Sequence, residues 1–194
     1  GGEGGTDATI PLAANKAVAF ASEEVQEQFG GAYVLVPQCP TYWMEGENGM
    51  ADGTCIYEEG LMEMIQDYVA NNEGVDANRI YVGGCSNGGY MTMLLMRDYP
   101  DYFAAAYPVC EGLADTLVSD EDINIYKDEA IWFVLAATDT TLDPVVYSLP
   151  TYVRLKEAGA ENVHMTFFNN VSDQTGLYRQ ENDQPHEYDG HWSW

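Results

Sequence analysis

Short apolar runs recur along the chain, each bounded by glycine, proline or polar residues. Most of them are apolar at successive positions rather than at every second one, which is typical of strands buried on both faces of a sheet. The run at 163–168 alternates more clearly. We therefore predict strands at residues 32–36, 79–84, 103–109, 131–137 and 163–168.

The stretches between these runs have helical periodicity. One is rich in alanine, places its glutamates on a polar face and stops at Gly30 and Gly31. We predict helices at residues 10–29, 56–71, 87–98 and 147–158, and one more within the acidic segment 112–129. Residues 169–190 are polar and aromatic, and we predict a loop there. The alternation of strands and helices predicts an α/β fold with a mostly parallel sheet covered by helices on both faces.

Composition narrows the possible functions. The chain has 194 residues, which suits one domain, and its hydrophobic fraction of 46% argues against disorder. Lys and Arg number 7 and Asp and Glu 32, so the net charge is −25. This charge repels phosphate backbones and anionic membrane surfaces, so we expect neither nucleic acid nor membrane as a partner. No apolar run has the roughly 20 residues of a membrane helix.

The most informative motif is G-x-S-x-G at residues 84–88, which places Ser86 between a predicted strand and a predicted helix. In that setting the motif forms a sharp turn that exposes a nucleophilic serine. The helix that follows directs N–H groups and the positive end of its dipole toward the serine. The alternative interpretation is a glycine-rich turn with a solvated serine.

A nucleophilic serine needs a base, and the chain has three histidines. His164 lies in a predicted strand, where a packed histidine is the simpler interpretation, and His186 follows a proline in a polar loop. We favour His191, because the base comes last in the order serine, acid, histidine of this motif's fold. The alternative for His191 is a solvent-facing residue near the chain end.

The acid that orients the base is expected just after a strand between Ser86 and His191. Asp139 and Asp143 both follow the strand predicted to end at Ala137. We favour Asp139, which comes first, over Asp143, whose backbone is restricted by Pro144. For either residue the alternative is a turn-forming aspartate.

The sequence does not indicate a metal or a cofactor. Residues 120–131 fail the calcium-loop pattern, because Ile125 replaces its glycine and Ile131 its glutamate. No His or Cys spacing suggests zinc, and no glycine-rich nucleotide loop is convincing. Cys39 and Cys55 flank a loop and could be bridged, whereas Cys85 and Cys110 are interpreted as buried small residues, and the four allow three full pairings.

These features together resemble a group of bacterial α/β-hydrolase esterases that includes polyhydroxybutyrate depolymerases and feruloyl or acetyl-xylan esterases, some of them labelled prolyl-oligopeptidase-like. The similarity runs the whole length in order. The matching stretches are residues 2–7, 36–40, 79–90, 107–110, 131–139 and 190–194.

The resemblance implies an α/β-hydrolase catalytic domain over residues 1–194, with Ser86 as nucleophile, Asp139 as acid and His191 as base. It also implies an oxyanion hole formed by the N–H groups of Asn87 and of Gly1 or Gly2. Compared with the family, the chain begins after a His-Gly pair and ends before the helix that usually follows the histidine. We therefore expect a fragment that lacks the first strands and the C-terminal helix.

The expected function is hydrolysis of carboxylic esters, either small molecules or acyl groups on a polysaccharide, or a polyester. Tyr42, Trp43 and Trp192 are candidates for stacking on a sugar or phenolic ring, although anchoring of their loops in the core is an equal alternative. A peptidase or a non-catalytic binding domain of the same fold are the other possibilities. A polymeric substrate and a disulfide would suggest secretion. Nothing in the sequence indicates an oligomeric state.

Overall fold

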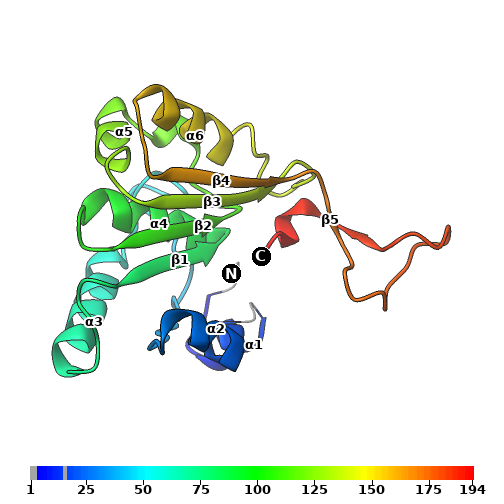
Figure 1. The fold of residues 1–194 in the computed structure, drawn as a ribbon. Helices are drawn as coiled ribbons and strands as arrows, with labels where there is room; N and C mark the ends of the chain where they lie inside the picture. The colour runs from blue at the N-terminus through cyan, green and yellow to red at the C-terminus, as the bar shows by residue number, and fades with distance from the viewer. Residues whose placement is uncertain (1–3, 15–16) are drawn as a thin grey trace.

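The fold is built on one parallel sheet. The computed structural model describes residues 4–14 and 17–194, so Gly1 and Gly2 lie outside the described residues. Its strands are β1 (Tyr81–Cys85), β2 (Ala105–Val109), β3 (Ile131–Ala136) and β4 (Val163–Phe168). They lie in the order β1-β2-β3-β4, and each neighbouring pair is parallel (Figure 1). The predicted α/β class is confirmed, as are these four strand positions.

One face of the sheet forms the hydrophobic core. Helices α4 (Asn87–Asp98), α5 (Asp120–Tyr126) and α6 (Ser148–Glu157) lie on this face. The strand residues that point toward them are almost fully buried, and α4 is buried along most of its length. The buried strand residues are Ala106, Ile131, Phe133, Leu135 and Val163. Because α4 follows Ser86 directly, the packing of this helix fixes the turn that carries the serine.

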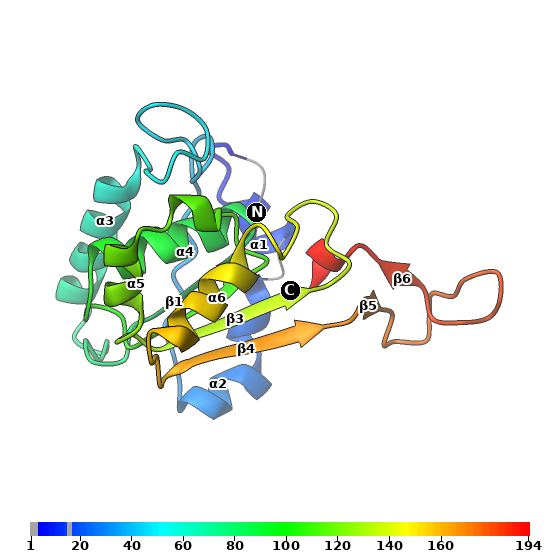
Figure 2. The ribbon, with the colours of Figure 1, turned by 90° about the horizontal axis from the view of Figure 1, so that it is seen from above.

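The opposite face of the sheet is covered over β1 and β2. The 3-10 helix η1 (Ala17–Ala21) and helix α2 (Glu23–Phe29) lie there (Figure 2). Two ring contacts join them to the sheet, Phe20 to Tyr107 at 5.9 Å and Phe29 to Tyr81 at 5.8 Å between centroids. Further along the sheet, Trp132 on β3 is 52% exposed. The described residues therefore cover both faces only in the part of the sheet near β1.

The single helix predicted at residues 10–29 is wrong. The chain instead forms α1 (Thr9–Ala14), η1 and α2. Ser22 has an extended backbone and its hydroxyl accepts a hydrogen bond from the N–H of Val25, so it caps a new helix and ends the preceding one. The predicted stop is confirmed, because Gly30 adopts the left-handed conformation that ends α2.

The strand predicted at residues 32–36 is also wrong. This segment has no regular secondary structure and pairs with no strand in the described part of the chain. Its apolar side chains are substantially exposed, with Tyr33 at 58%. An apolar run becomes a strand only when a neighbouring strand takes its backbone hydrogen bonds, and β1 pairs here only with β2.

The remaining predictions are close to the observed bounds. Helix α3 covers Glu58–Asn71, and α4 and α6 match their predicted ranges within a residue or two. The predicted loop at 169–190 contains a short antiparallel hairpin of β5 (Val171–Ser172) and β6 (Glu187–Tyr188). Two further 3-10 helices are η2 (Asp115–Leu117) and η3 (Gly190–Trp192). No helix in the described residues has the length and apolar character to cross a membrane.

Candidate active site

Ser86 lies in a strained turn between β1 and α4. Its backbone has φ 57° and ψ −119°, a combination that non-glycine residues seldom adopt. The Ser86 N–H donates to the carbonyl of Val109, and the Ser86 carbonyl accepts from the N–H of Tyr90 (2.9 and 3.0 Å). The turn is thus anchored to β2 on one side and to the first turn of α4 on the other.

The glycines around Ser86 are required by close contacts. A Cβ atom on Gly84 would lie 2.5 Å from the backbone of Gly88. A Cβ atom on Gly89 would lie 2.6 Å from the Cβ of Glu111 and 2.8 Å from its Cα. Real side chains do not approach so closely, so the turn can form only with glycine at these positions. This explains in physical terms why the motif has small residues there.

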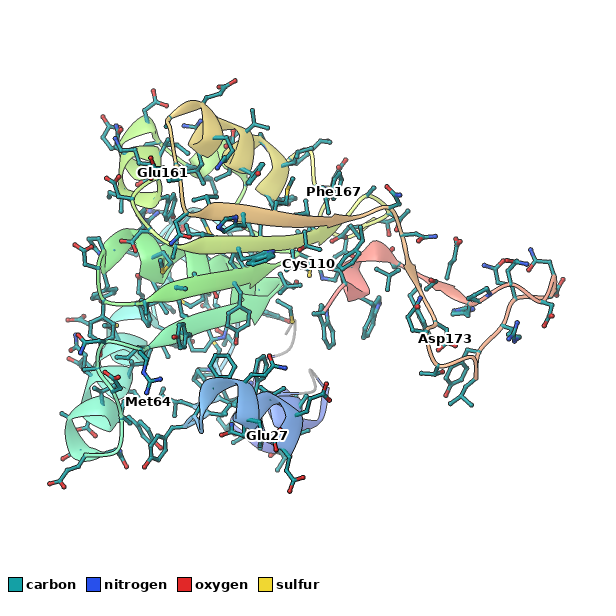
Figure 3. All side chains as sticks on the ribbon, in the orientation of Figure 1. Glu27, Met64, Cys110, Glu161, Phe167 and Asp173 are labelled. Atoms are coloured by element: carbon teal, nitrogen blue, oxygen red, sulfur yellow. The ribbon has the colours of Figure 1, made fainter. Side chains whose placement is uncertain are left out.

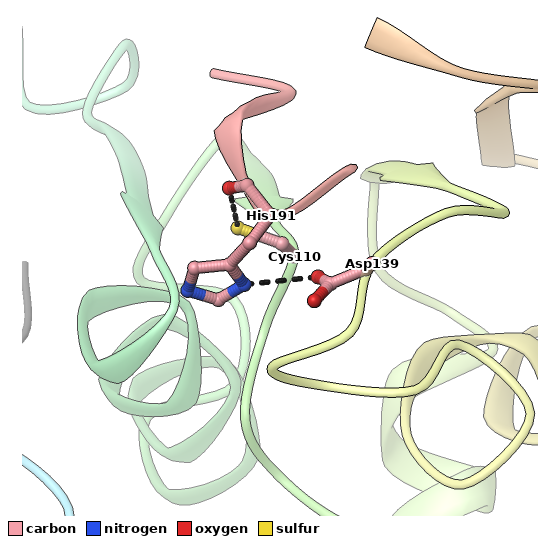
Figure 4. A group of neighbouring side chains, drawn as sticks. All are labelled: Cys110, Asp139 and His191. Carbon is pink, nitrogen blue, oxygen red and sulfur yellow. Dashed lines mark hydrogen bonds and ion pairs between the residues drawn. The ribbon is translucent and has the colours of Figure 1, made fainter. Parts of the chain in front are cut away.

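Asp139 and His191 are in contact. His191 Nδ1 lies 2.9 Å from Asp139 Oδ2 (Figure 4). Asp139 is buried at the end of β3, and its other oxygen accepts the N–H groups of Thr141 and Leu142 (2.9 and 2.8 Å). A carboxylate can only accept hydrogen bonds, so this contact places the proton on Nδ1 and leaves Nε2 able to take a proton. Asp143, the alternative acid, is exposed and accepts the N–H of Val145 instead.

The backbone before His191 packs closely against the segment that carries Asp139 and is hydrogen-bonded to it. Gly190 donates its N–H to the carbonyl of Thr138 at 3.0 Å, and a Cβ there would lie 2.4 Å from the backbone nitrogen of Asp139. Asp189 accepts the N–H of His191 at 2.8 Å and the N–H and hydroxyl of Thr140. These hydrogen bonds hold the pKa of Asp189 below its usual range, led by the Thr140 hydroxyl.

Cys110 is a contact that the sequence interpretation missed, because it predicted only a small buried residue. Its thiol donates to the carbonyl of His191 at 3.3 Å, and Figure 3 shows it at the end of the sheet beside η3. Burial raises the pKa of this thiol to about 12, so it remains a donor at neutral pH. Cys110 follows Val109, whose carbonyl accepts the Ser86 N–H. Ser86 and His191 therefore both lie at the carboxyl ends of the paired strands β1 and β2.

The serine hydroxyl itself makes no hydrogen bond within residues 4–14 and 17–194. The structure thus brings Asp139 and His191 into direct contact and places Ser86 at the same end of the sheet. Catalytic hydrogen bonds are often long without a bound substrate, so this geometry is compatible with a triad.

The donor set near His191 could also suit a metal. Ligand atoms of Cys110, Asp139 and His191 lie within 4.8 Å of one another, and zinc accepts sulfur, nitrogen and oxygen ligands. Here the three side chains already make hydrogen bonds, Cys110 to the backbone of His191 and Asp139 to its ring. We therefore interpret the cluster as an acid–base pair with a supporting thiol.

Asn87 opens α4, so its backbone N–H lies in the helical turn whose donors point toward the end that carries Ser86. Its buried side chain accepts the N–H of Met44 at 2.9 Å, which attaches the loop of Tyr42 and Trp43 next to the serine turn. Trp43 packs against the hydrophobic core, as expected of a loop anchor. Tyr42 is exposed, as is Trp192, which lies against Trp194 with ring centroids 5.2 Å apart.

Glu111 lies in the core beneath the serine turn. Its carboxyl accepts the N–H of Leu113 at 2.6 Å and the hydroxyl of Ser148 at 2.9 Å. Ser148 begins α6, which follows the loop of Asp139. Burial raises the pKa of Glu111 to about 7. Glu111 therefore connects the end of β2 to the helix that follows the acid.

The chain is similar to known hydrolases in sequence. A model of the Prolyl oligopeptidase family matches residues 60–134. The chain is 30% identical over 89 residues to poly(3-hydroxyalkanoate) depolymerase C of Paucimonas lemoignei, an alignment that covers 41% of this chain and 20% of that protein. The chain therefore spans about a fifth of the length of this curated relative.

Solved structures superpose on this fold. A thermostable esterase superposes with a TM-score of 0.77 and 27% identity, over 99% of this chain and 47% of the esterase. Arabidopsis thaliana SOBER1 superposes with a TM-score of 0.54 and 19% identity, over 86% of this chain and 85% of SOBER1, which is a similarity of fold alone.

Proposed function

We propose that this chain, which has the α/β-hydrolase fold and is related to esterases of that fold, is a serine hydrolase of carboxylic esters. The observation that carries the proposal is the hydrogen bond between His191 Nδ1 and Asp139 Oδ2, at the sheet edge that also carries Ser86 in its strained turn. Similarity to an esterase and to a depolymerase supports the same class of reaction.

In the proposed reaction, His191 Nε2 takes the hydroxyl proton of Ser86 as the serine oxygen attacks the ester carbonyl. The carbonyl π electrons move to its oxygen, and the N–H of Asn87 and an N–H from Gly1 or Gly2 would stabilise that oxyanion. Collapse of the intermediate breaks the bond to the alcohol, which leaves with the proton from His191. Water then repeats the sequence on the acyl-enzyme and releases the acid and Ser86.

Each group has a defined contribution. Asp139 keeps the proton of His191 on Nδ1 and stabilises the imidazolium that forms in each step. One oxyanion donor contributes about 3–4 kcal/mol in a comparable protease. The strained backbone at Ser86 presents the hydroxyl beyond the end of β1, where a substrate can reach it.

The test is the hydrolysis of p-nitrophenyl acetate by the protein and by Ser86→Ala. We expect Ser86→Ala to lower kcat by roughly 10⁶-fold, to the rate that remains when a triad nucleophile is removed. Ser22→Gly is the matched control, because it replaces an exposed serine that caps α2 on the other face of the sheet. Turnover retained by a folded Ser86→Ala protein would refute the assignment.

A second candidate is a peptidase with the same three residues. The match of residues 60–134 to the Prolyl oligopeptidase family favours it, since a serine triad can cleave amides as well as esters. A panel of acylated sugars, p-nitrophenyl esters and peptide anilides distinguishes the two. Faster cleavage of anilides than of esters, compared by kcat/KM, would favour the peptidase.

We also propose that the ester is attached to a polymer and that the protein is secreted to reach it. The related depolymerase supports a polymeric ester as one class of substrate. The net charge of −25 favours a neutral substrate over an anionic one, because like charges lower the local concentration of the ligand.

A further inference from the structure

Two buried cysteines lie at the ends of the loop that precedes α3. The loop begins at Cys39 and ends at Cys55, and we call it the 39–55 loop. The two side chains have exposed fractions of only 3% and 8%, and both thiols are free in the structure. Within the loop, the N–H of Met44 donates to the side chain of Asn87, next to the serine turn (2.9 Å). The loop therefore connects two buried thiols to the candidate active site.

The two ends of the 39–55 loop lie side by side. The hydroxyls of Thr41 and Tyr57, each two residues after one of the cysteines, are hydrogen-bonded at 3.0 Å. Each thiol accepts the N–H of the residue two positions further on, Cys39 from Thr41 and Cys55 from Tyr57, the latter at 3.4 Å. Both sulfur atoms thus point toward the same pair of bonded side chains. They are also close enough that a charge on Cys39 would raise the pKa of Cys55.

We propose that Cys39 and Cys55 form a disulfide that closes the 39–55 loop beside the candidate active site. As the S–S bond forms, the two thiols lose two protons and two electrons. A small-molecule disulfide of the glutathione class takes them up and is cleaved to two thiols. The proposal is independent of the esterase function.

A bridge at this place would stabilise the protein and restrain the loop. Cys39 and Cys55 are 16 positions apart, so a disulfide between them would remove much of the freedom of that segment in the unfolded chain. In the folded state it would limit how far Met44 can move from Asn87. The oxidising surroundings of a secreted protein would preserve such a bridge.

The burial of the thiols indicates when the bridge forms. Burial raises the pKa of Cys55 to about 11 and raises that of Cys39 in the same direction. Thiol–disulfide exchange needs a thiolate, so the two thiols react slowly near neutral pH once the protein has folded. The bridge should therefore form in the unfolded or partly folded chain, and the fold should then shield it from reductants.

The first experiment maps the bridge chemically. The protein is refolded with reduced and oxidised glutathione, unfolded without reductant, alkylated with iodoacetamide, digested and analysed by mass spectrometry. We expect one disulfide-linked peptide pair, Cys39 with Cys55, and alkylation of Cys85 and Cys110. Alkylation of all four cysteines, or a linkage of Cys39 or Cys55 to either of the other two, overturns the proposal.

The second experiment separates a bridge from the packing of two buried thiols. The parent protein is reduced in urea and refolded with tris(2-carboxyethyl)phosphine, which should lower its melting temperature by about 6–12 °C. The same treatment should leave the double variant Cys39→Ala with Cys55→Ala unchanged, which makes that variant the matched control. An equal shift in both proteins overturns the proposal.

The single variants complete the test. Without reductant, Cys39→Ala and Cys55→Ala should each lower the melting temperature by nearly as much as the double variant, because the first substitution already breaks the bridge. Effects that simply add would contradict a disulfide. Failure of the parent protein to hydrolyse p-nitrophenyl acetate would count against the esterase function alone, because these measurements detect the bridge without turnover.

Discussion

The two sides of the candidate active site are held in place by different means. On the nucleophile side, Ser86 is positioned by steric crowding: its backbone is strained, and Gly84 and Gly89 leave room for nothing larger. On the acid–base side, Asp139 and His191 are positioned by hydrogen bonds among residues about 50 positions apart in the chain. The first arrangement is local and rigid, and the second depends on the whole sheet being assembled.

This difference predicts what a substitution on each side will change. A change to Asp139 or His191 should alter protonation while the fold persists, whereas a larger residue at the glycines around Ser86 should destabilise the fold itself. The following variants test that distinction.

Among the variants that compare the two sides, the largest expected effect is that of replacing the acid. Asp139→Asn keeps an oxygen for the N–H groups of Thr141 and Leu142 but turns an NH₂ group toward His191, which forces the proton onto Nε2. We expect kcat on p-nitrophenyl acetate to fall on the order of 10⁴-fold with an unchanged melting curve, as for the equivalent change in a serine protease. Asp143→Asn is the control and should retain most of the activity. Loss of activity in Asp143→Asn rather than in Asp139→Asn would assign the acid to the other residue.

The next effect is steric. Gly89→Ala places a methyl group 2.6 Å from the side chain of Glu111, and we expect it to destabilise the protein by about 1–3 kcal/mol or to prevent folding. Gly60→Ala is the matched control, because Gly60 also lies in a helix but has open space where the methyl group would be. It should stabilise by about 1 kcal/mol through helix propensity. Equal melting temperatures of the two variants would contradict the steric account of the turn.

The same distinction explains which parts of the molecule the sequence could predict. Helix α4 was predicted at its observed bounds and Ser86 at its turn, because glycine spacing and helical periodicity are local. Asp139 could be favoured over Asp143 only by its order after the strand and by the restriction that Pro144 places on the backbone of Asp143. The reason that Asp139 meets His191 is that Gly190 lies against the backbone of residues 138 and 139, a contact between distant segments.

The predictions that were wrong have related causes. The strand at residues 32–36 needed a neighbour that no local pattern could supply, and the helix at 10–29 was broken by the capping geometry of Ser22. The thiol of Cys110 was not predicted as a contact to His191, because its role depends on how η3 lies against β2. Asp189 could have been found from its place two residues before His191, where an aspartate can cap a helical turn.

A third expected effect is on the pH dependence of stability, through Glu111, which lies between the serine turn and the helix that follows Asp139. The pKa of Glu111 is raised to about 7 in the fold, above its ordinary value of 4.5, so the folded state binds a proton that the unfolded state releases. Stability should therefore fall as pH rises from about 4.5 to about 7, by at most roughly 3 kcal/mol from this group. Glu111→Gln should remove that part of the decline, measured by urea unfolding at pH 5 and pH 8.

Glu58, whose pKa burial and Asp98 also raise to about 7, contributes a decline in the same direction. Only the difference between the parent protein and Glu111→Gln therefore isolates Glu111. An identical pH dependence in both proteins would show that Glu111 is not buried as described.

The smallest expected effect is on the thiol that supports His191. Cys110→Ala removes the hydrogen bond to the carbonyl of His191, and we expect kcat to fall by about two- to tenfold with little change in KM. Cys85→Ala is the comparison, since no hydrogen bond joins its side chain to His191. If both variants behave alike, the thiol contributes only to packing.

The most direct test of the proposed triad is to locate its nucleophile chemically. The protein is treated with a fluorophosphonate that forms a stable adduct with activated serines, and the labelled peptide is identified by mass spectrometry. We predict one adduct, on Ser86, and its loss in His191→Ala, which lacks the base. An adduct on another serine, or no adduct on a folded protein, would rule out Ser86 as the nucleophile.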